Sequence, residues 1–269
     1  MRPAALLRQN RTRMMFNAFA QLLWRDLWVT YRDWKSFLAT SLMQPVFFLF
    51  IFGRLLPSLG QAVTGYSVVI LPGVIGLTTL LTSMTAIVIP LAVEFGYTKE
   101  IEDRLLSPLP IWGVAIAKLC YAAIRGIVAG AMVFPLGWLI LGKGFIVSSD
   151  HLGLLLVVSV LGALSGAAVG LTLGTMVPPT KVGLVLPLVL PPLLFTGCVY
   201  YPWAQLHILR WYQIVTLFSP LTYSSEGFRA ALAPNLPHLP TMFIILGQTA
   251  FLLIFGTLGV MGFKKKALE

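Results

Sequence analysis

The chain has 269 residues, of which 58% are hydrophobic and only 10% are charged. Because a soluble domain carries about a quarter charged residues, this composition excludes a soluble globular protein and indicates an integral membrane protein. Its 19 basic and 9 acidic residues give a formal net charge of +10. The basic residues flank the apolar runs, so the excess fits membrane orientation and argues against a nucleic acid as partner.

The first predicted element is a helix over residues 14–35 that lies in the membrane interface. Large apolar side chains recur there at helical spacing, and Arg and Asp residues occupy other positions. The apolar positions are Phe16, Phe19, Leu23, Leu27 and Trp34. A basic leader anchored by aromatic residues is the alternative interpretation of this stretch.

Six later stretches are apolar and about 20 residues long, the length that a helix needs to cross the hydrocarbon region. They cover residues 37–56, 68–93, 112–141, 152–177, 182–200 and 241–263. With the N-terminus inside, 14 Lys and Arg residues fall on the cytoplasmic side and 4, including Arg229, on the outer side. This bias predicts that both termini are cytoplasmic.

Residues 94–110 form the densest cluster of mixed charge between two apolar runs, and we expect them in water at the cytoplasmic face. Read as a helix, the segment pairs Glu100 with Arg104 and ends at Pro108. Its apolar edge beside acids predicts a docking element for a partner, and a solvated connector is the alternative. The expected partner contacts are Glu94, Glu100, Glu102, Asp103, Arg104 and Leu105.

Arg125 is the one charge deep inside a predicted span, since Arg54 and Lys118 lie near the ends of theirs. At the bilayer centre an arginine costs about 2.5 to 3.5 kcal/mol on insertion scales, so we expect Arg125 to lie away from the centre. Lys118 lies two turns earlier on the same face, which allows Arg125 to snorkel to the inner interface. A contact with an anionic substrate is the other interpretation. None of the predicted spans holds an acid in its middle, which counts against an ion-coupled carrier.

The fourth predicted span has a glycine at every fourth position, which leaves one helix face as nearly bare backbone. Such a face permits close helix packing. It can serve an interface between subunits or a substrate surface, or it can pack within the chain. The glycines are Gly162, Gly166, Gly170 and Gly174. The fifth span contains three prolines, which predict a kinked helix.

Residues 198–229 are too aromatic for an ordinary outer loop and too interrupted by Pro202 and Pro220 for a span. We expect two short re-entrant helices in the outer leaflet, with protein covering their ends. The aromatic rings suit either an interfacial belt or an exit gate. The gate candidates are Tyr200, Tyr201, Trp203, Trp211 and Tyr223.

Motifs for chemistry are missing from the sequence. It holds no G-x-x-x-x-G-K-[ST] phosphate loop. Its three histidines have no metal-ligand spacing with the two cysteines. We therefore expect no catalytic residue, no metal site and no cofactor bound by this chain. An intramembrane lipid-modifying enzyme would need a cluster of His, Asp, Cys or Ser at one depth, which the sequence does not provide.

Several blocks, in this order, resemble the ABC-2 type transporter permeases, which include daunorubicin-type drug, nodulation lipo-oligosaccharide and polysaccharide exporters. The blocks are the amphipathic N-terminal helix, Glu102 to Pro108 followed by Trp112 and Lys118, and the outer blocks Gly197 to Pro202 and Pro220 to Tyr223 with Arg229. The family often has Gly-Thr before the acidic pair and Gly-Lys at the start of the third span. This chain has Glu100-Ile101 and Ala117-Lys118 there.

The resemblance implies one all-α transmembrane domain over residues 1–269, with 94–110 as its coupling helix. It implies two permease subunits, a homodimer or a pair with a different permease, and two copies of a cytoplasmic P-loop ATPase, which binds ATP and Mg. The protein would lie in the inner (plasma) membrane, surrounded by lipid, and export an amphipathic drug, lipid or lipid-linked saccharide. A secondary transporter or channel driven by an ion gradient, or a lipid-modifying enzyme, is the alternative.

Overall fold

The computed structural model describes residues 3–60, 65–98, 109–142, 145, 147–148 and 150–268, with side chains from Arg13 onward except at 97 and 98. Within these ranges all regular structure is helical. The six predicted spans are confirmed as helices long and apolar enough to cross a membrane. They are Trp34–Ser58, Tyr66–Gly96, Ile111–Leu141, Leu152–Met176, Pro179–Thr196 and Thr241–Lys266. The protein is an all-α integral membrane protein.

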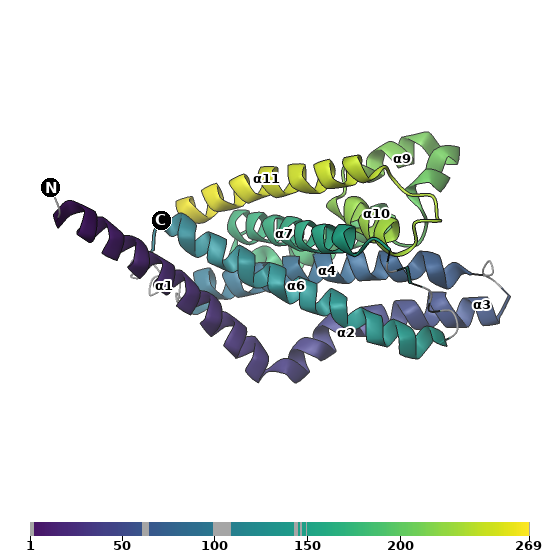
Figure 1. Cartoon of the computed structure of the whole chain (residues 1–269), viewed down its shortest axis with the longest axis horizontal. Helices are drawn as coiled ribbons and strands as arrows, with labels where there is room; N and C mark the ends of the chain where they lie inside the picture. The colour runs from purple at the N-terminus through teal and green to yellow at the C-terminus, as the bar shows by residue number, and fades with distance from the viewer. Residues whose placement is uncertain are drawn as a thin grey trace.

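Helix α1 (Pro3–Arg32) is the predicted N-terminal helix, and it begins earlier than expected. It leaves the bundle and meets α2 (Trp34–Phe50) at a sharp angle at Asp33, whose backbone has φ −105° and ψ 37° (Figure 1). The Thr30 hydroxyl lies 2.7 Å from the Tyr121 hydroxyl of α6 (Ile111–Leu141), which ties the end of α1 to the bundle. Trp24 and Trp28 stack with ring centroids 6.3 Å apart and remain exposed, as suits a membrane interface.

The centre of the bundle is α4 (Tyr66–Val93), which packs against α6 (Ile111–Leu141) and α7 (Leu152–Met176). In its most apolar window 83% of the residues are buried. A helix that is apolar on all sides is expected at the centre of a bundle. Helix α2 continues through a π-helical turn, η1 (Ile51–Leu55), into α3 (Leu56–Ser58). Helix α11 (Thr241–Lys266) covers α7 (Figure 1).

The fifth span lies at the edge of the bundle. A 3₁₀ turn, η4 (Pro179–Lys181), leads into α8 (Val182–Thr196). Only 6% of the residues in the most apolar stretch of this span are buried. The prolines lie inside one continuous helix because membrane helices tolerate proline where local adjustments satisfy the freed carbonyls. The helix ends at Thr196, four residues before the predicted end of the span, and Gly197 follows it.

Residues 198–229, which we call the outer segment, contribute to three short helices, one more than we predicted. They are η5 (Trp203–Leu209), α9 (Arg210–Thr216) and α10 (Pro220–Leu232). Helix α10 is buried almost along its whole length between α4, α7 and α11, so it belongs to the core of the bundle. It fits there because a Cβ atom at Gly76 of α4 would lie 2.9 Å from the Ser225 backbone nitrogen.

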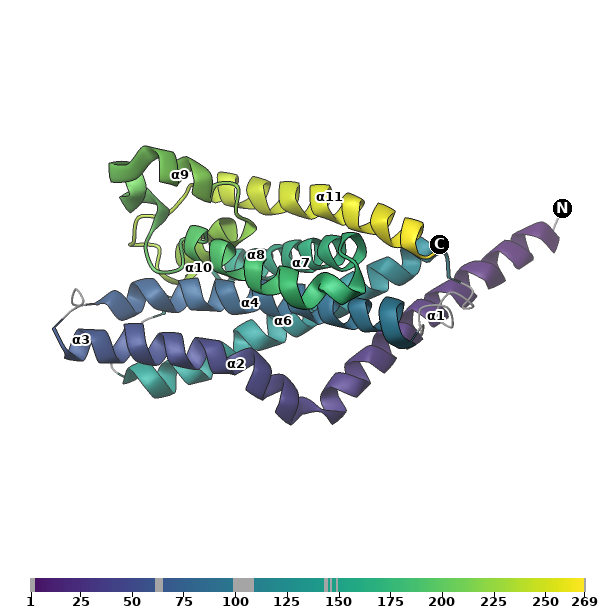
Figure 2. The same cartoon turned by 180° about the vertical axis from the view of Figure 1, so that it is seen from behind.

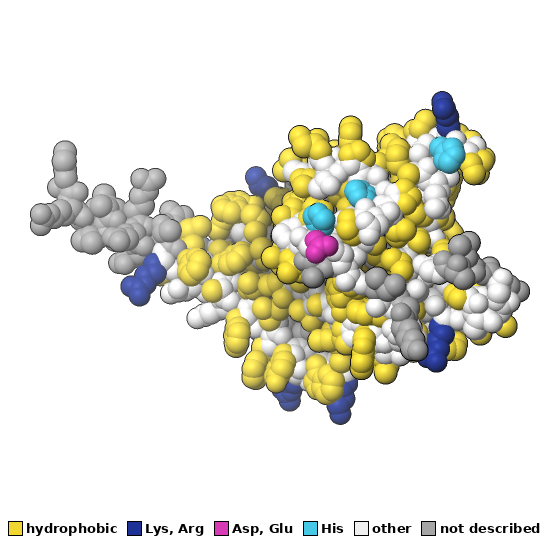
Figure 3. Space-filling model, turned by 45° about the vertical axis from the view of Figure 1, so that its right-hand side comes forward, with side chains coloured by type: hydrophobic (Ala, Val, Ile, Leu, Met, Phe, Trp, Pro, Cys, Tyr) yellow, Lys and Arg dark blue, Asp and Glu magenta, His cyan; other side chains and the backbone are white. Residues whose placement is uncertain are grey.

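Both chain termini lie at the same end of the bundle, which we call the terminal end (Figures 1 and 2). The α9 helix lies at the opposite end, as the view from behind also shows. Between the ends, Figure 3 shows a surface dominated by apolar side chains, with Lys and Arg at its margins. A surface of this kind suits contact with lipid chains.

Candidate functional site

A buried ion pair lies at the terminal end, between η2 (Glu94–Thr98) and α6. The Lys118 Nζ atom lies 2.8 Å from Glu94 Oε1 and 2.6 Å from Oε2, and the residues are 5% and 6% exposed. The prediction that Glu94 lies in water is therefore wrong, because Lys118 provides a matching charge inside the protein. A contact between Glu94 and a partner stays a prediction.

The π-helical turn η2 continues α4, so residues 94–98 end a membrane helix and do not begin a separate one. Phe95 packs edge-on against Phe263 of α11, with ring centroids 5.6 Å apart. A Cβ atom at Gly96 would lie 2.5 Å from the Pro179 ring of η4. Together with the Glu94–Lys118 pair, these contacts tie η2 to α6, η4 and α11. The other expected partner contacts, Glu100, Glu102, Asp103, Arg104 and Leu105, lie outside the described residues.

A second buried ion pair joins Glu226 and Arg229, one turn apart on α10. Both side chains are fully buried. Glu226 accepts hydrogen bonds from the backbone nitrogens of Trp203 and Leu239, each 2.8 Å away. Arg229 donates to the Cys198 carbonyl over 3.0 Å. The pair therefore fastens the backbone at Cys198, Trp203 and Leu239 to α10, and Arg229, which was counted among the bases of the outer side, lies inside the protein.

The five gate candidates do not form one cluster. Tyr200 packs on Phe48 and Phe52, with ring centroids 5.6 Å and 5.1 Å away. The Tyr201 hydroxyl donates to the Phe195 carbonyl over 2.6 Å, and the Tyr223 hydroxyl donates to the Leu217 carbonyl over 2.9 Å. The remaining two differ in exposure.

The Trp203 indole donates to the Gln213 carbonyl over 3.2 Å, whereas Trp211 is 66% exposed. Burial raises the pKa of Tyr200 to about 12 and also raises the pKa of Tyr201, so both hydroxyls stay protonated at neutral pH. Most of the aromatic residues thus brace the outer segment through contacts with different neighbours. A role of these residues as a gate stays a prediction.

Arg125 lies in the middle of α6, held between aromatic rings. Its guanidinium carbon is 4.9 Å from the centroid of the Phe37 ring and 5.7 Å from that of Tyr121. One of its terminal nitrogens donates to the Tyr121 hydroxyl over 3.1 Å. Within the described part of the chain, no carboxylate forms an ion pair with Arg125. Lys118, expected as its companion on the same face, is instead paired with Glu94.

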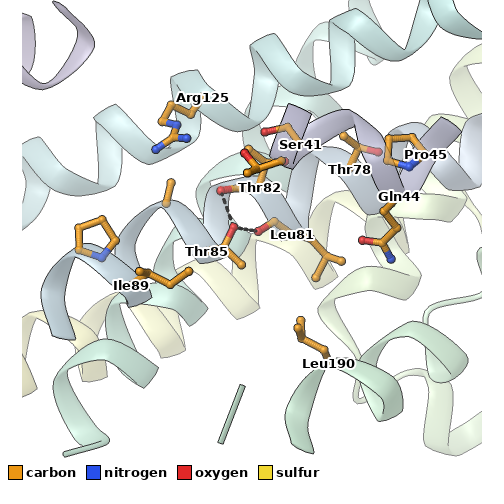
Figure 4. Close-up of a pocket in the computed structure, with 13 residues that line it drawn as sticks. Ser41, Gln44, Pro45, Thr78, Leu81, Thr82, Thr85, Ile89, Arg125 and Leu190 are labelled. Atoms are coloured by element: carbon orange, nitrogen blue, oxygen red, sulfur yellow. Dashed lines mark hydrogen bonds between the residues drawn. The ribbon is translucent and has the colours of Figure 1, made fainter. Parts of the chain in front are cut away.

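The guanidinium of Arg125 lines a pocket of about 330 Å³ between α2, α4, α6 and α8. In Figure 4, Arg125 lies at one side of this pocket and Gln44 at the other, with Thr82 and Ser41 between them. The full polar lining is Thr40, Ser41, Gln44, Thr78, Thr82, Thr85 and Arg125. A pocket lined by polar groups in an otherwise apolar bundle is typical of a place where a solute binds.

The sequence was compared with known proteins. The model of the family described as ABC-2 type transporter matches residues 17–233. The chain belongs to the ABC-2 type transporter family. No curated protein matches the chain. Members of this family are the membrane components of ABC transporters, so the chain is the permease component, and the family implies an association with an ABC ATPase subunit.

The glycine face of α7 in the permease packs against other helices of the same chain. A Cβ atom at Gly166 would lie 2.5 Å from the Leu80 carbonyl oxygen, and one at Gly170 would lie 2.9 Å from the Met84 Cα atom. Gly162 faces Ser224 of α10. Of the interpretations left open, the structure therefore supports packing within the chain, because α4 and α10 cover this face of α7.

The described part of the permease contains two buried acids that its sequence did not indicate. Glu94 and Glu226 are both buried, although neither lies in the middle of a predicted span. Each acid has a basic partner, Lys118 or Arg229, so neither is an open site for a coupling ion. The signal at Glu226 was an acid and a base three residues apart in an apolar helix, a spacing that allows them to pair.

Proposed function

We propose that this permease exports an amphipathic drug, lipid or lipid-linked saccharide from the cytoplasm, driven by ATP hydrolysis on a separate ATPase subunit. Two permease chains, as a homodimer, would associate with two ATPase chains, which bind the ATP and Mg. The protein would lie in the inner (plasma) membrane with both termini in the cytoplasm. The excess of Lys and Arg on the predicted cytoplasmic segments supports this orientation.

The observation that carries the proposal is the attachment of η2 to three membrane helices. A force on the adjacent charged segment would act on α6 through the Glu94–Lys118 pair and on α11 through Phe95. It would act on α8 through the contact between Gly96 and Pro179. Closure of the ATPase dimer would thereby change the packing of several spans at once, which is how rigid elements carry coupling.

The proposal is tested by reversing the two adjacent acids, Glu102→Lys together with Asp103→Lys. We expect the variant to insert and fold normally, and to lose most ATP-dependent export because opposite charges now face the ATPase. The measurement compares export and ATP hydrolysis by the purified complex in proteoliposomes. The matched control is Asp150→Lys, an exposed acid at the opposite end of the bundle, which we expect to leave export unchanged. Normal export by the double variant would refute the coupling role.

A further inference from the structure

Arg125 lies between two cavities, one lined by both polar and apolar side chains and one lined almost wholly by apolar side chains. The first is the polar pocket of about 330 Å³ shown in Figure 4. The second, of about 300 Å³, lies between α1, α2 and α6 and is lined almost wholly by apolar side chains, including Phe37, Trp34 and Met132. One cation that borders a polar and an apolar chamber is suited to a molecule with a polar head and an apolar tail.

Most N–H donors of the Arg125 guanidinium are available to bind a ligand. The group has five N–H donors, and within the described residues the side chain makes one hydrogen bond, to the Tyr121 hydroxyl. The Nε atom is buried and has no hydrogen-bond partner. The two aromatic rings hold the charge without neutralising it, since a cation–π contact leaves the formal charge in place. An anionic oxygen would complete the site, because guanidinium binds carboxylate or phosphate in two-point geometry.

The other polar side chains of this pocket favour a second kind of group on the ligand. Thr40, Thr78 and Thr85 donate their hydroxyl protons to carbonyls one turn back, over 2.8, 2.7 and 2.9 Å, so they offer the pocket mainly lone pairs. A bare anion has no proton to give to those lone pairs, whereas a hydroxylated headgroup does. Ser41 and Gln44 make no side-chain hydrogen bond within the described ranges and can serve either kind of group.

We propose that this pocket binds the headgroup of an anionic amphiphile that also carries hydroxyl groups, with its phosphate or carboxylate on Arg125 and its tail in the apolar chamber. The volume lies at the small end of ligand pockets, which suits a headgroup of the size of a polyol phosphate. The inference narrows the substrate class of the proposed function. Its test uses the permease alone, so a failed ATPase association and a failed binding site are told apart.

The test is equilibrium binding to the full chain in phosphatidylcholine nanodiscs. The probe is radiolabelled dioctanoyl phosphatidylglycerol, which is anionic and has two free hydroxyls. We expect Arg125→Gln to weaken binding by about tenfold, in line with the loss of charge-assisted hydrogen bonds. The control Arg210→Gln removes an exposed arginine at the opposite end, and we expect it to change affinity by less than about twofold. Equal binding by Arg125→Gln and the unmodified chain would overturn the site.

Two further probes separate the parts of the proposal. Dioctanoyl phosphatidylmethanol lacks the hydroxyls and should bind more weakly than phosphatidylglycerol, and the difference should shrink in Ser41→Ala with Thr82→Val. Glycerol phosphate lacks the tails and should bind far more weakly to the unmodified chain. If phosphatidylmethanol binds as tightly as phosphatidylglycerol, the hydroxyl contacts are wrong. If glycerol phosphate binds as tightly as phosphatidylglycerol, the proposal that the apolar chamber holds the tail is wrong.

Discussion

Replacing Gly170 by alanine is expected to lower the free energy of unfolding of the permease by about 1 to 3 kcal/mol, the usual range for overpacking. The added Cβ atom would lie 2.9 Å from the Met84 Cα atom, so the backbones of α7 and α4 must move apart. Because these two helices form the centre of the bundle, moving their backbones apart weakens the packing along their whole interface. Reversible unfolding in mixed detergent micelles measures the effect.

The matched control is Gly256→Ala, in the middle of α11, where a Cβ atom meets nothing within 4 Å. Alanine is the better helix former by about 0.8 to 1 kcal/mol in water, so this variant should be as stable as the original or more stable. A Gly170→Ala variant that is as stable as Gly256→Ala would show that α4 and α7 do not pack as described.

Removing one partner of the Glu226–Arg229 pair is expected to have the largest effect on stability. Arg229→Met leaves a fully buried carboxylate without its cation, for which losses of about 3 to 5 kcal/mol are typical. Arg229→Met combined with Glu226→Gln removes both charges and should be less destabilised than Arg229→Met alone. Unfolding measurements on the two single variants and the double variant provide the coupling energy.

An independent readout comes from Cys198, which is fully buried and whose carbonyl accepts a hydrogen bond from Arg229. Burial, and then the charge of Glu226, raise the pKa of this thiol to about 12, so almost none is thiolate at pH 8. In a Cys120→Ser background, maleimide should label Cys198 slowly, and Arg229→Met should speed labelling by exposing the outer segment. Equal labelling rates, with additive losses of stability, would contradict the fastening role of the pair.

The spans could be predicted from the sequence because a membrane helix needs only length and apolar composition, and both are local properties. The end of α4 could not be predicted in the same way. Glu94 begins a charged stretch, so the sequence predicted an exposed segment from this residue onward. The helix instead continues through η2, because Lys118 forms an ion pair with Glu94. That partner is 24 residues away, and no local pattern indicates the pairing.

The candidate sites were predictable to different degrees for the same reason. Arg125 was evident as an isolated charge, but its place beside a polar pocket depends on hydroxyls from α2 and α4. The glycine face of α7 predicted close packing but not its partner, which is set by the tertiary arrangement. The prolines around α10 predicted a short re-entrant helix, and its small and apolar residues allow it to pack in the core.

The most direct test of the central claim is to purify the permease gently from its native membranes and to identify the proteins that remain bound, with and without ATP. We predict a P-loop ATPase in equal amount, lost from the Glu102→Lys with Asp103→Lys variant. The same complex should move solute in proteoliposomes only when ATP is supplied. A permease that purifies alone and moves solute on an ion gradient would contradict the account.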